Sequence, residues 1–149
     1  MDIERQIFYN KFHQVLRENL LNGNVCFPDN INVSYNDITA YRIISRKPEE
    51  SDICINKDDF MSQMQLNKIK QVRPPVDPND IGYYSCSLFT DVEQLKIIMH
   101  LPRPKKHLIK GLVKDKNGVC DSEDKKSHIN WWLYESADPS EDFELFEVE

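Results

Sequence analysis

The first 21 residues carry a helical pattern of hydrophobic and polar positions. Apolar side chains recur at spacings of three and four between residues 3 and 21, which predicts one amphipathic helix with a single apolar stripe. Asn22 and Gly23 follow, and both residues tolerate the left-handed backbone conformation in which many helices end. Such a helix needs a sheet or another helix to cover its stripe.

The rest of the chain is dominated by segments with the two-residue period of β-strands. The pattern predicts strands over residues 31–35, 40–45, 53–55, 83–89, 107–114, 119–121, 128–134 and 143–148. The last of these predicted strands follow one another without helices between them, so we expect an antiparallel sheet.

Two short helices and one hairpin complete the expected elements. Acidic residues from Asp58 onward are typical of a helix N-terminus. Thr90 and Glu93 have the spacing of a capping box, which predicts a second helix up to about residue 100. Asn117-Gly118 is a strong signal for a hairpin between the strands on either side.

Together these elements predict a mixed α+β fold. We expect a mostly antiparallel, curved sheet with the N-terminal amphipathic helix and one or two further short helices on one side. A length of 149 residues fits a single domain over 1–149, with the segment 135–149 contributing to an edge strand.

Composition narrows the location and the cofactors. Charges occur throughout the first 20 residues, and no apolar run approaches the ~18–20 residues of a membrane span, so we expect a cytoplasmic protein without a membrane contact. The chain has only four glycines, and no glycine-rich phosphate loop or paired-histidine metal motif occurs in it. We therefore expect no cofactor and no metal.

Four cysteines are widely spaced and form no C-x-x-C pair. They are Cys26, Cys54, Cys86 and Cys120. In a cytoplasmic chain such residues are typical of buried free thiols, so we expect no disulfide.

Charge is distributed unevenly along the chain. The net charge is −6, which disfavours nucleic acid as a partner. Between Lys96 and Lys114 there are six basic residues and no acidic ones, whereas residues 135–149 hold seven acidic residues and no basic ones. Either the two segments lie together and partly neutralise each other, or the basic segment contacts a phosphate-bearing or acidic partner.

The predicted strand 128–134 carries the first candidate site. Alternation places Ile129, Trp131 and Leu133 toward a core. It places on the opposite face four side chains that can stack on a planar ligand and bond to its edge, namely His128, Asn130, Trp132 and Tyr134. The alternative is a partly solvated sheet face with an aromatic ladder. His128 is a candidate general base.

Two other predicted strands carry further candidates. Arg42 and Arg46 share one face of a strand, where they either pair with Asp58 or Asp59 or bind an anion. Ser85 and Ser87 share one face of a later strand, beside the predicted helix that starts near residue 90.

Tyr41-Arg42 on an early strand and Ser85-Cys86-Ser87 on a later one resemble two of the three marks of the ADP-ribosyltransferase family. The resemblance implies that the arginine binds the phosphates of a nicotinamide dinucleotide. It also implies a catalytic glutamate late in the chain, for which Glu135 is the candidate. The Glu-x-Glu pair of that family is matched only by Glu147-Val148-Glu149 at the end of the sequence.

Two functions follow from these patterns. The first is a small intracellular interaction or regulatory protein, similar in kind to immunity, antitoxin or phage accessory proteins, which binds a protein partner or a small ligand. In that case the acidic segment 135–149 would contribute to binding. The alternative is a nucleotide-handling enzyme that uses Arg42 or Arg46 for phosphate, Trp132 and Tyr134 for stacking, and His128 or Glu135 for proton chemistry. RNA binding through residues 96–114 is a third interpretation, which the acidic net charge disfavours.

Overall fold

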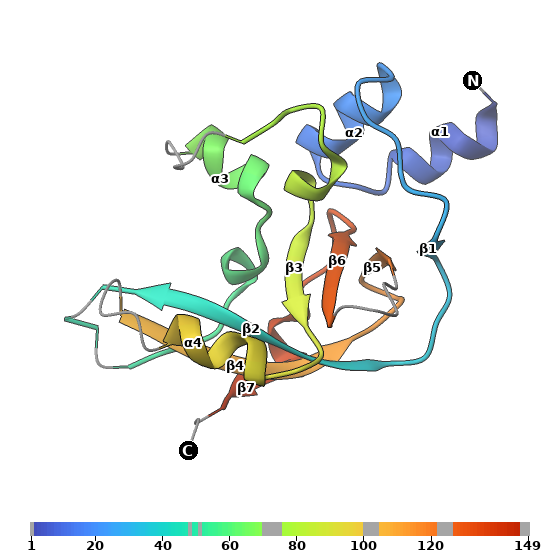
Figure 1. The fold of residues 1–149 in the computed structure, drawn as a ribbon. Coiled ribbons are helices and arrows are strands. Elements are labelled where there is room, and N and C mark those ends of the chain that lie inside the picture. The colour runs from blue at the N-terminus through green and yellow to red at the C-terminus, as the bar shows by residue number, and fades with distance from the viewer. Residues whose placement is uncertain are drawn as a thin grey trace.

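The computed structural model describes residues 2–47, 49–50, 52–69, 76–99, 105–121 and 127–146. An antiparallel sheet of seven strands, which is not closed, forms the centre of this part of the chain, in the order β1-β5-β6-β3-β2-β4-β7 (Figure 1). The strands are β1 (Ile31–Asn32), β2 (Ile38–Arg46), β3 (Cys86–Phe89), β4 (Lys105–Val113), β5 (Gly118–Asp121), β6 (His128–Leu133) and β7 (Phe143–Leu145). The predicted α+β class is confirmed, and the last strand lies at an edge as expected.

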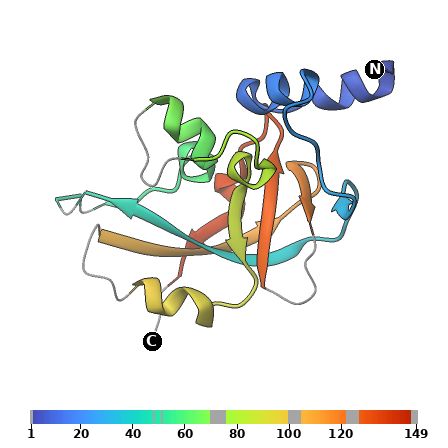
Figure 2. The same cartoon turned by 45° about the horizontal axis from the view of Figure 1, so that its top comes forward.

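Helices lie around this sheet. They are α1 (Ile3–Tyr9), α2 (Gln14–Leu21), α3 (Gln63–Ile69) and α4 (Glu93–Met99), with single 3-10 turns η1 (Lys57–Phe60), η2 (Ile81–Tyr84) and η3 (Pro139–Asp142). Figure 2 shows α1 and α2 along one end of the sheet and α4 near the opposite end. Of the helices in the described ranges, none combines the length and apolarity that a membrane span requires.

The sheet bends sharply between β2 and β3. These two strands pair only where Tyr41 lies opposite Phe89, whereas β2 and β4 pair along their whole length. As a result, β3 and β6 run steeply across β2 and β4 (Figure 1). The bend encloses an inner core, whose largest side chains are Phe60, Leu88, Ile109, Trp131 and Phe143.

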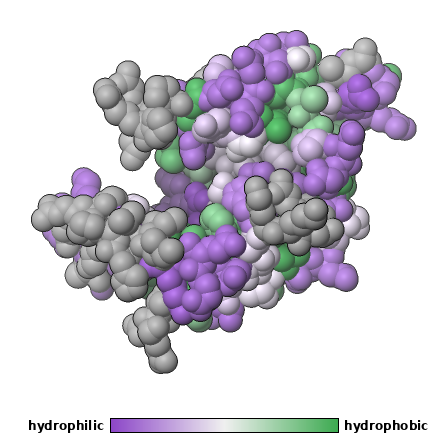
Figure 3. All heavy atoms as spheres, in the orientation of Figure 1, coloured by the Kyte–Doolittle hydropathy of each residue, from purple (hydrophilic) through white to green (hydrophobic). Residues whose placement is uncertain are grey.

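A second core covers the other face of β5 and β6. It consists of Phe12, Leu16, Leu20, Val25, Met64, Tyr84, Val119 and Trp132, and we call it the α2 core. Trp131 and Trp132 therefore point into different cores, because successive side chains of a strand lie on opposite faces. This end of the sheet is covered on both faces. Figure 3 shows hydrophobic surface among polar residues around α1 and α2.

The predicted helix over 3–21 is wrong in its middle. The first helix, α1, ends at Tyr9, and Phe12 then forms a bridge with Tyr134 and is fully buried. Pairing with the extension of β6 takes the place of continued helix, and His13 then caps the N-terminus of α2. The stripe is not covered along its length, since Ile3 and Ile7 are 73% and 58% exposed.

The hairpin predicted at Asn117-Gly118 is also wrong. A turn follows β4, but β5 pairs with β1 and β6 and not with β4. Gly118 lies so close to β6 that a Cβ atom there would collide with the Trp132 carbonyl oxygen. The glycine therefore serves the β5–β6 contact rather than a tight turn.

Smaller local predictions also differ from the structure. Residues 53–55 form no strand. The carboxylate of Asp91 accepts a hydrogen bond from the Glu93 amide at 3.0 Å, so Asp91 takes the capping role expected of Thr90. All four cysteines are free, but Cys26 and Cys54 are exposed, contrary to expectation, because they lie outside the strands.

The acidic and basic segments lie together, as one of the two interpretations expected. β7 pairs with β4, which places Glu144 opposite Lys110. Lys114 Nζ lies 3.0 Å from Asp142 Oδ1, and this contact raises the pKa of the lysine. Part of the acidic segment is therefore used within the fold. Glu147 and Glu149 lie outside the described residues.

Candidate functional site

The face of β6 that we expected to be open is covered at its Trp132 end. Trp132 is 1% exposed, its ring packs edge-on against Phe27, and its indole nitrogen donates to the carbonyl of Ile81 at 3.0 Å. The expectation that Trp132 offers an accessible stacking surface is therefore wrong. The cause is the α2 core, which buries this ring from a part of the chain more than 100 positions away.

The middle of the same face holds a hydrogen-bonded network. Asn130 donates through its backbone and side-chain nitrogens to both carboxylate oxygens of Asp121, each at 2.8 Å. The Ser85 hydroxyl lies 2.9 Å from Asn130 Oδ1 and 2.7 Å from the Gly82 carbonyl. Ser85 and Asp121 are buried, so these groups satisfy one another inside the protein.

His128 lies at the other end of β6. Its ring contacts Phe89 with centroids 5.1 Å apart, and both residues are half-buried. Ser87 is half-buried on β3, opposite Asn130. His128 is thus separated along β6 from Tyr134, and the four predicted side chains do not form one surface.

Both candidate arginines are used within the fold. Arg46 forms two 2.7 Å hydrogen bonds with the Asp59 carboxylate, and the two side chains are 12% and 8% exposed. Arg42 donates to the carbonyl oxygens of Asp59 and Ser87 at 2.8 and 2.6 Å. These contacts fasten η1 to β2 and β3. The ion pair with Asp59, the alternative to anion binding, is present at Arg46.

Tyr134 and Glu135, at the end of β6, line two adjoining hollows. The narrow hollow has a volume of about 70 Å³ and extends toward His13, Lys57 and Gln65. The wide hollow has a volume of about 570 Å³ and is lined by Asn10, Lys11, Lys116, Tyr134, Glu135 and Ser136. Two of the predicted candidates, Tyr134 and Glu135, thus lie together at a hollow of the surface.

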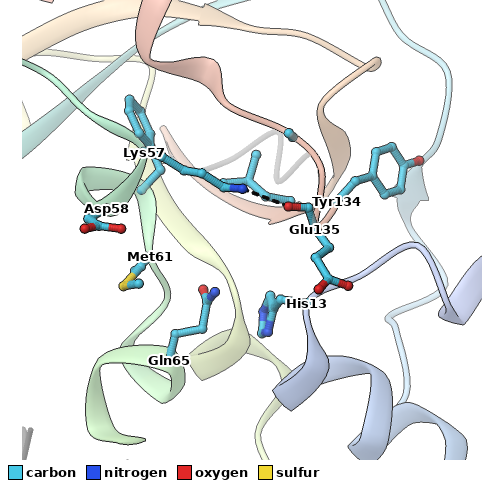
Figure 4. A pocket seen from close by; sticks show the side chains of 10 residues that line it. His13, Lys57, Asp58, Met61, Gln65, Tyr134 and Glu135 are labelled. Carbon is cyan, nitrogen blue, oxygen red and sulfur yellow. Dashed lines mark hydrogen bonds between the residues drawn. The ribbon is translucent and has the colours of Figure 1, made fainter. Parts of the chain in front are cut away.

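Glu135 is held by three different elements. Its amide donates to the Lys11 carbonyl at 2.8 Å, and its carbonyl accepts from Lys57 Nζ at 2.9 Å. Its carboxylate lies 2.8 Å from Arg17 Nη1. Figure 4 shows Lys57 reaching across to the Glu135 backbone, while the Tyr134 ring points away from the narrow hollow. Glu135, which lines both hollows, is therefore fixed in position.

His13, at the edge of the narrow hollow, has both ring nitrogens engaged. Nδ1 accepts from the Leu16 amide at 3.3 Å, which caps α2, and Nε2 lies 3.4 Å from the Tyr84 carbonyl. Burial lowers the pKa of His13 to about 4, so the imidazole is neutral near pH 7. A neutral imidazole that caps a helix is a structural group, and neither nitrogen is free to act as a base.

The wide hollow is rich in hydrogen-bond donors. Lys11 Nζ lies 5.7 Å from the centroid of the Tyr134 ring, a cation–π contact. Burial, followed by the charge of Asp115, raises the pKa of the Tyr134 hydroxyl, so it keeps its proton and can donate. The side chains of Asn10, Lys116 and Ser136 are exposed in the same hollow.

The dimensions of the hollows limit their chemistry. The narrow one has room for about two water molecules or the tip of one side chain. The wide one is large enough for a small ligand, but apart from Tyr134 its lining residues are all exposed. Sites for small molecules usually enclose most of the ligand. The wide hollow is therefore an open depression rich in hydrogen-bond donors.

Sequence reasoning missed most residues of this site. Lys11 and His13 fell inside the predicted N-terminal helix, Lys57 just before a predicted short helix and Lys116 before the predicted hairpin. They meet because Phe12 bridges to Tyr134 and η1 lies beside residue 135. No local motif marks such a convergence, since the four residues come from three separate parts of the chain.

Comparisons with protein-family models, with curated proteins and with solved structures find no match for the chain.

Proposed function

We propose that this chain is an interaction protein that binds a protein partner at the wide hollow beside Tyr134 and Glu135. The observation that carries the proposal is the form of this hollow, which is about 570 Å³ in volume and lined almost wholly by exposed side chains. Two hydrogen bonds of the Glu135 backbone and one ion pair of its side chain hold this lining residue in position. A preformed surface loses little conformational entropy when it binds.

The engagement within the fold of several groups that an enzyme could use favours binding over catalysis. Ser85 is buried in the network with Asn130, and both ring nitrogens of His13 have partners. Arg42 and Arg46, which a nucleotide-handling enzyme would need for phosphate, donate to protein acceptors instead. A nucleophile beside a free base, as nucleophilic catalysis requires, does not occur among these candidates.

Site-specific photo-crosslinking tests the proposal. A photoreactive residue replaces Ser136 in the wide hollow, and a matched variant carries it at Ser45, an exposed serine on β2. In a lysate of the source organism, we expect one defined protein to crosslink from position 136 and not from position 45. The same adducts from both positions, or none from position 136, would contradict the proposal.

A further inference from the structure

We infer that the partner presents an acidic side chain, of aspartate or glutamate, to the wide hollow between Lys11 and Lys116. This inference rests on the proposed function and names the chemistry of the partner. It follows from the balance of donors, acceptors and charges around the hollow.

More of the lining groups can donate a hydrogen bond to an incoming carboxylate than carry a negative charge themselves. Two ammonium groups, of Lys11 and Lys116, line the hollow together with the hydroxyls of Tyr134 and Ser136 and the amide of Asn10. The one carboxylate of the lining, that of Glu135, is already paired with Arg17 at 2.8 Å. An incoming carboxylate therefore finds donors and a neutralised acid.

Neither Lys11 nor Lys116 forms an ion pair with a carboxylate within the described part of the chain. Lys11 contacts the Tyr134 ring, and Lys116 is exposed without an ion pair in these ranges. Asp115, next to Lys116, accepts a hydrogen bond from the Tyr35 amide at 3.2 Å, but its negative charge still acts on the Tyr134 hydroxyl, so the two ammonium groups outnumber this one carboxylate beside the hollow. In the free protein the two ammonium groups are hydrated, and an acidic side chain can replace that water.

The donor types favour a carboxylate over a phosphate. Lysines bind phosphate as well, but phosphate sites commonly combine them with free guanidinium groups, helix N-termini or glycine-rich loops. The guanidinium of Arg17, which contacts the lining residue Glu135, is engaged with that carboxylate and with the Phe12 carbonyl. Lysines beside a tyrosine hydroxyl provide separate single donors, which suit the two oxygens of a carboxylate. Charge complementarity of this kind selects partners and speeds their encounter.

A titration with model peptides tests the inference. The ¹⁵N-labelled protein is titrated with blocked hexaglutamate and, separately, with blocked hexaglutamine, at low and at high salt. We expect hexaglutamate to shift the amide signals of residues 10–11, 116 and 134–136, and to bind more weakly at high salt. We expect hexaglutamine to leave these signals in place.

Matched variants give the test its control. The double variant Lys11→Gln/Lys116→Gln should weaken hexaglutamate binding about fivefold, because exposed ion pairs are individually modest. Lys47→Gln, at an exposed lysine beyond β2, should leave it unchanged. Shifts elsewhere, equal shifts with hexaglutamine, or equal effects of both variants would overturn the inference. In those cases a partner crosslinked only from position 136 would still support the proposed function, so the two failures are distinguishable.

Discussion

Arg17 Nη1 lies 2.8 Å from Glu135 Oε2, and this ion pair joins α2 to the end of β6 across 118 positions of the chain. The same nitrogen donates to the Phe12 carbonyl at 3.1 Å. One guanidinium thus holds the start of α2, the bridge residue Phe12 and Glu135, which lines both hollows. It also neutralises the carboxylate that would otherwise repel an acidic partner.

The coupling between Arg17 and Glu135 is measurable by a double-mutant cycle. Because the two side chains are 26% and 58% exposed, we expect a coupling free energy of only about 0.2–1 kcal/mol. The measurement is urea unfolding of Arg17→Ala, Glu135→Ala and the double variant. Strictly additive losses of stability would mean that the pair does not join the two elements.

Trp132 is predicted to support the fold rather than contact a ligand. Trp132→Ala removes a fully buried ring and leaves the Ile81 carbonyl without its donor, so we expect a loss of about 3–5 kcal/mol in the free energy of unfolding. His128→Ala, at a half-buried site on the same face of β6, should cost about 1 kcal/mol or less. Similar losses for both variants would contradict the placement of Trp132 in the α2 core.

Replacement of Asp59 should lower the free energy of unfolding more than replacement of its neighbour Asp58. Asp59→Ala leaves the half-buried guanidinium of Arg46 with only the Glu50 carboxylate, at 3.8 Å, and should cost about 1.5–3 kcal/mol. Asp58→Ala removes an exposed acid and should change stability by about 0.5 kcal/mol or less. Chemical denaturation of the two variants checks this, and equal effects of the two substitutions would count against a stabilising pair between Arg46 and Asp59.

The stability of the protein should fall with decreasing pH in part through His13. Its folded-state pKa of about 4 lies below the ordinary value of 6.5, so the unfolded chain takes up a proton first. The contribution of neutral His13 is complete above pH 6.5 and is lost as the pH falls toward 4, by about 3 kcal/mol at most.

Replacement of His13 separates its effect from that of the carboxylates. Asparagine caps helices well and does not titrate, so His13→Asn should show a flatter decline of stability between pH 6.5 and 4. Thermal unfolding of both proteins across this range is the measurement. Parallel curves for the two proteins would show that His13 does not titrate as described.

The sequence predicted the elements whose burial is local. β2, β4, β6 and α4 lie close to their expected positions, because apolar residues recur in each segment at the spacing typical of its element. The pairing of the acidic and basic segments was also among the expectations, and Lys114 with Asp142 illustrates it. These features depend on neighbouring residues or on charge, which the sequence displays directly.

The predictions that failed concern features that depend on contacts between distant segments of the chain. Alternation along β6 distinguishes its two faces, but it does not reveal that α2 covers Trp132 on the second face. The period of residues 3–21 does not reveal that Phe12 pairs with Tyr134 and interrupts the helix. The wide hollow arises from the same interruption, so its lysines were not predicted as a group.

The most direct test of the account is the affinity of the purified protein for its crosslinked partner, measured by calorimetry for two tryptophan variants. Ser136→Trp fills the wide hollow, whereas Ser45→Trp adds the same ring to an exposed position on β2. We predict that Ser136→Trp weakens binding by at least about tenfold, or about 1.4 kcal/mol, and that Ser45→Trp binds as the unaltered protein does. Equal affinities of the two variants for the partner would contradict the account.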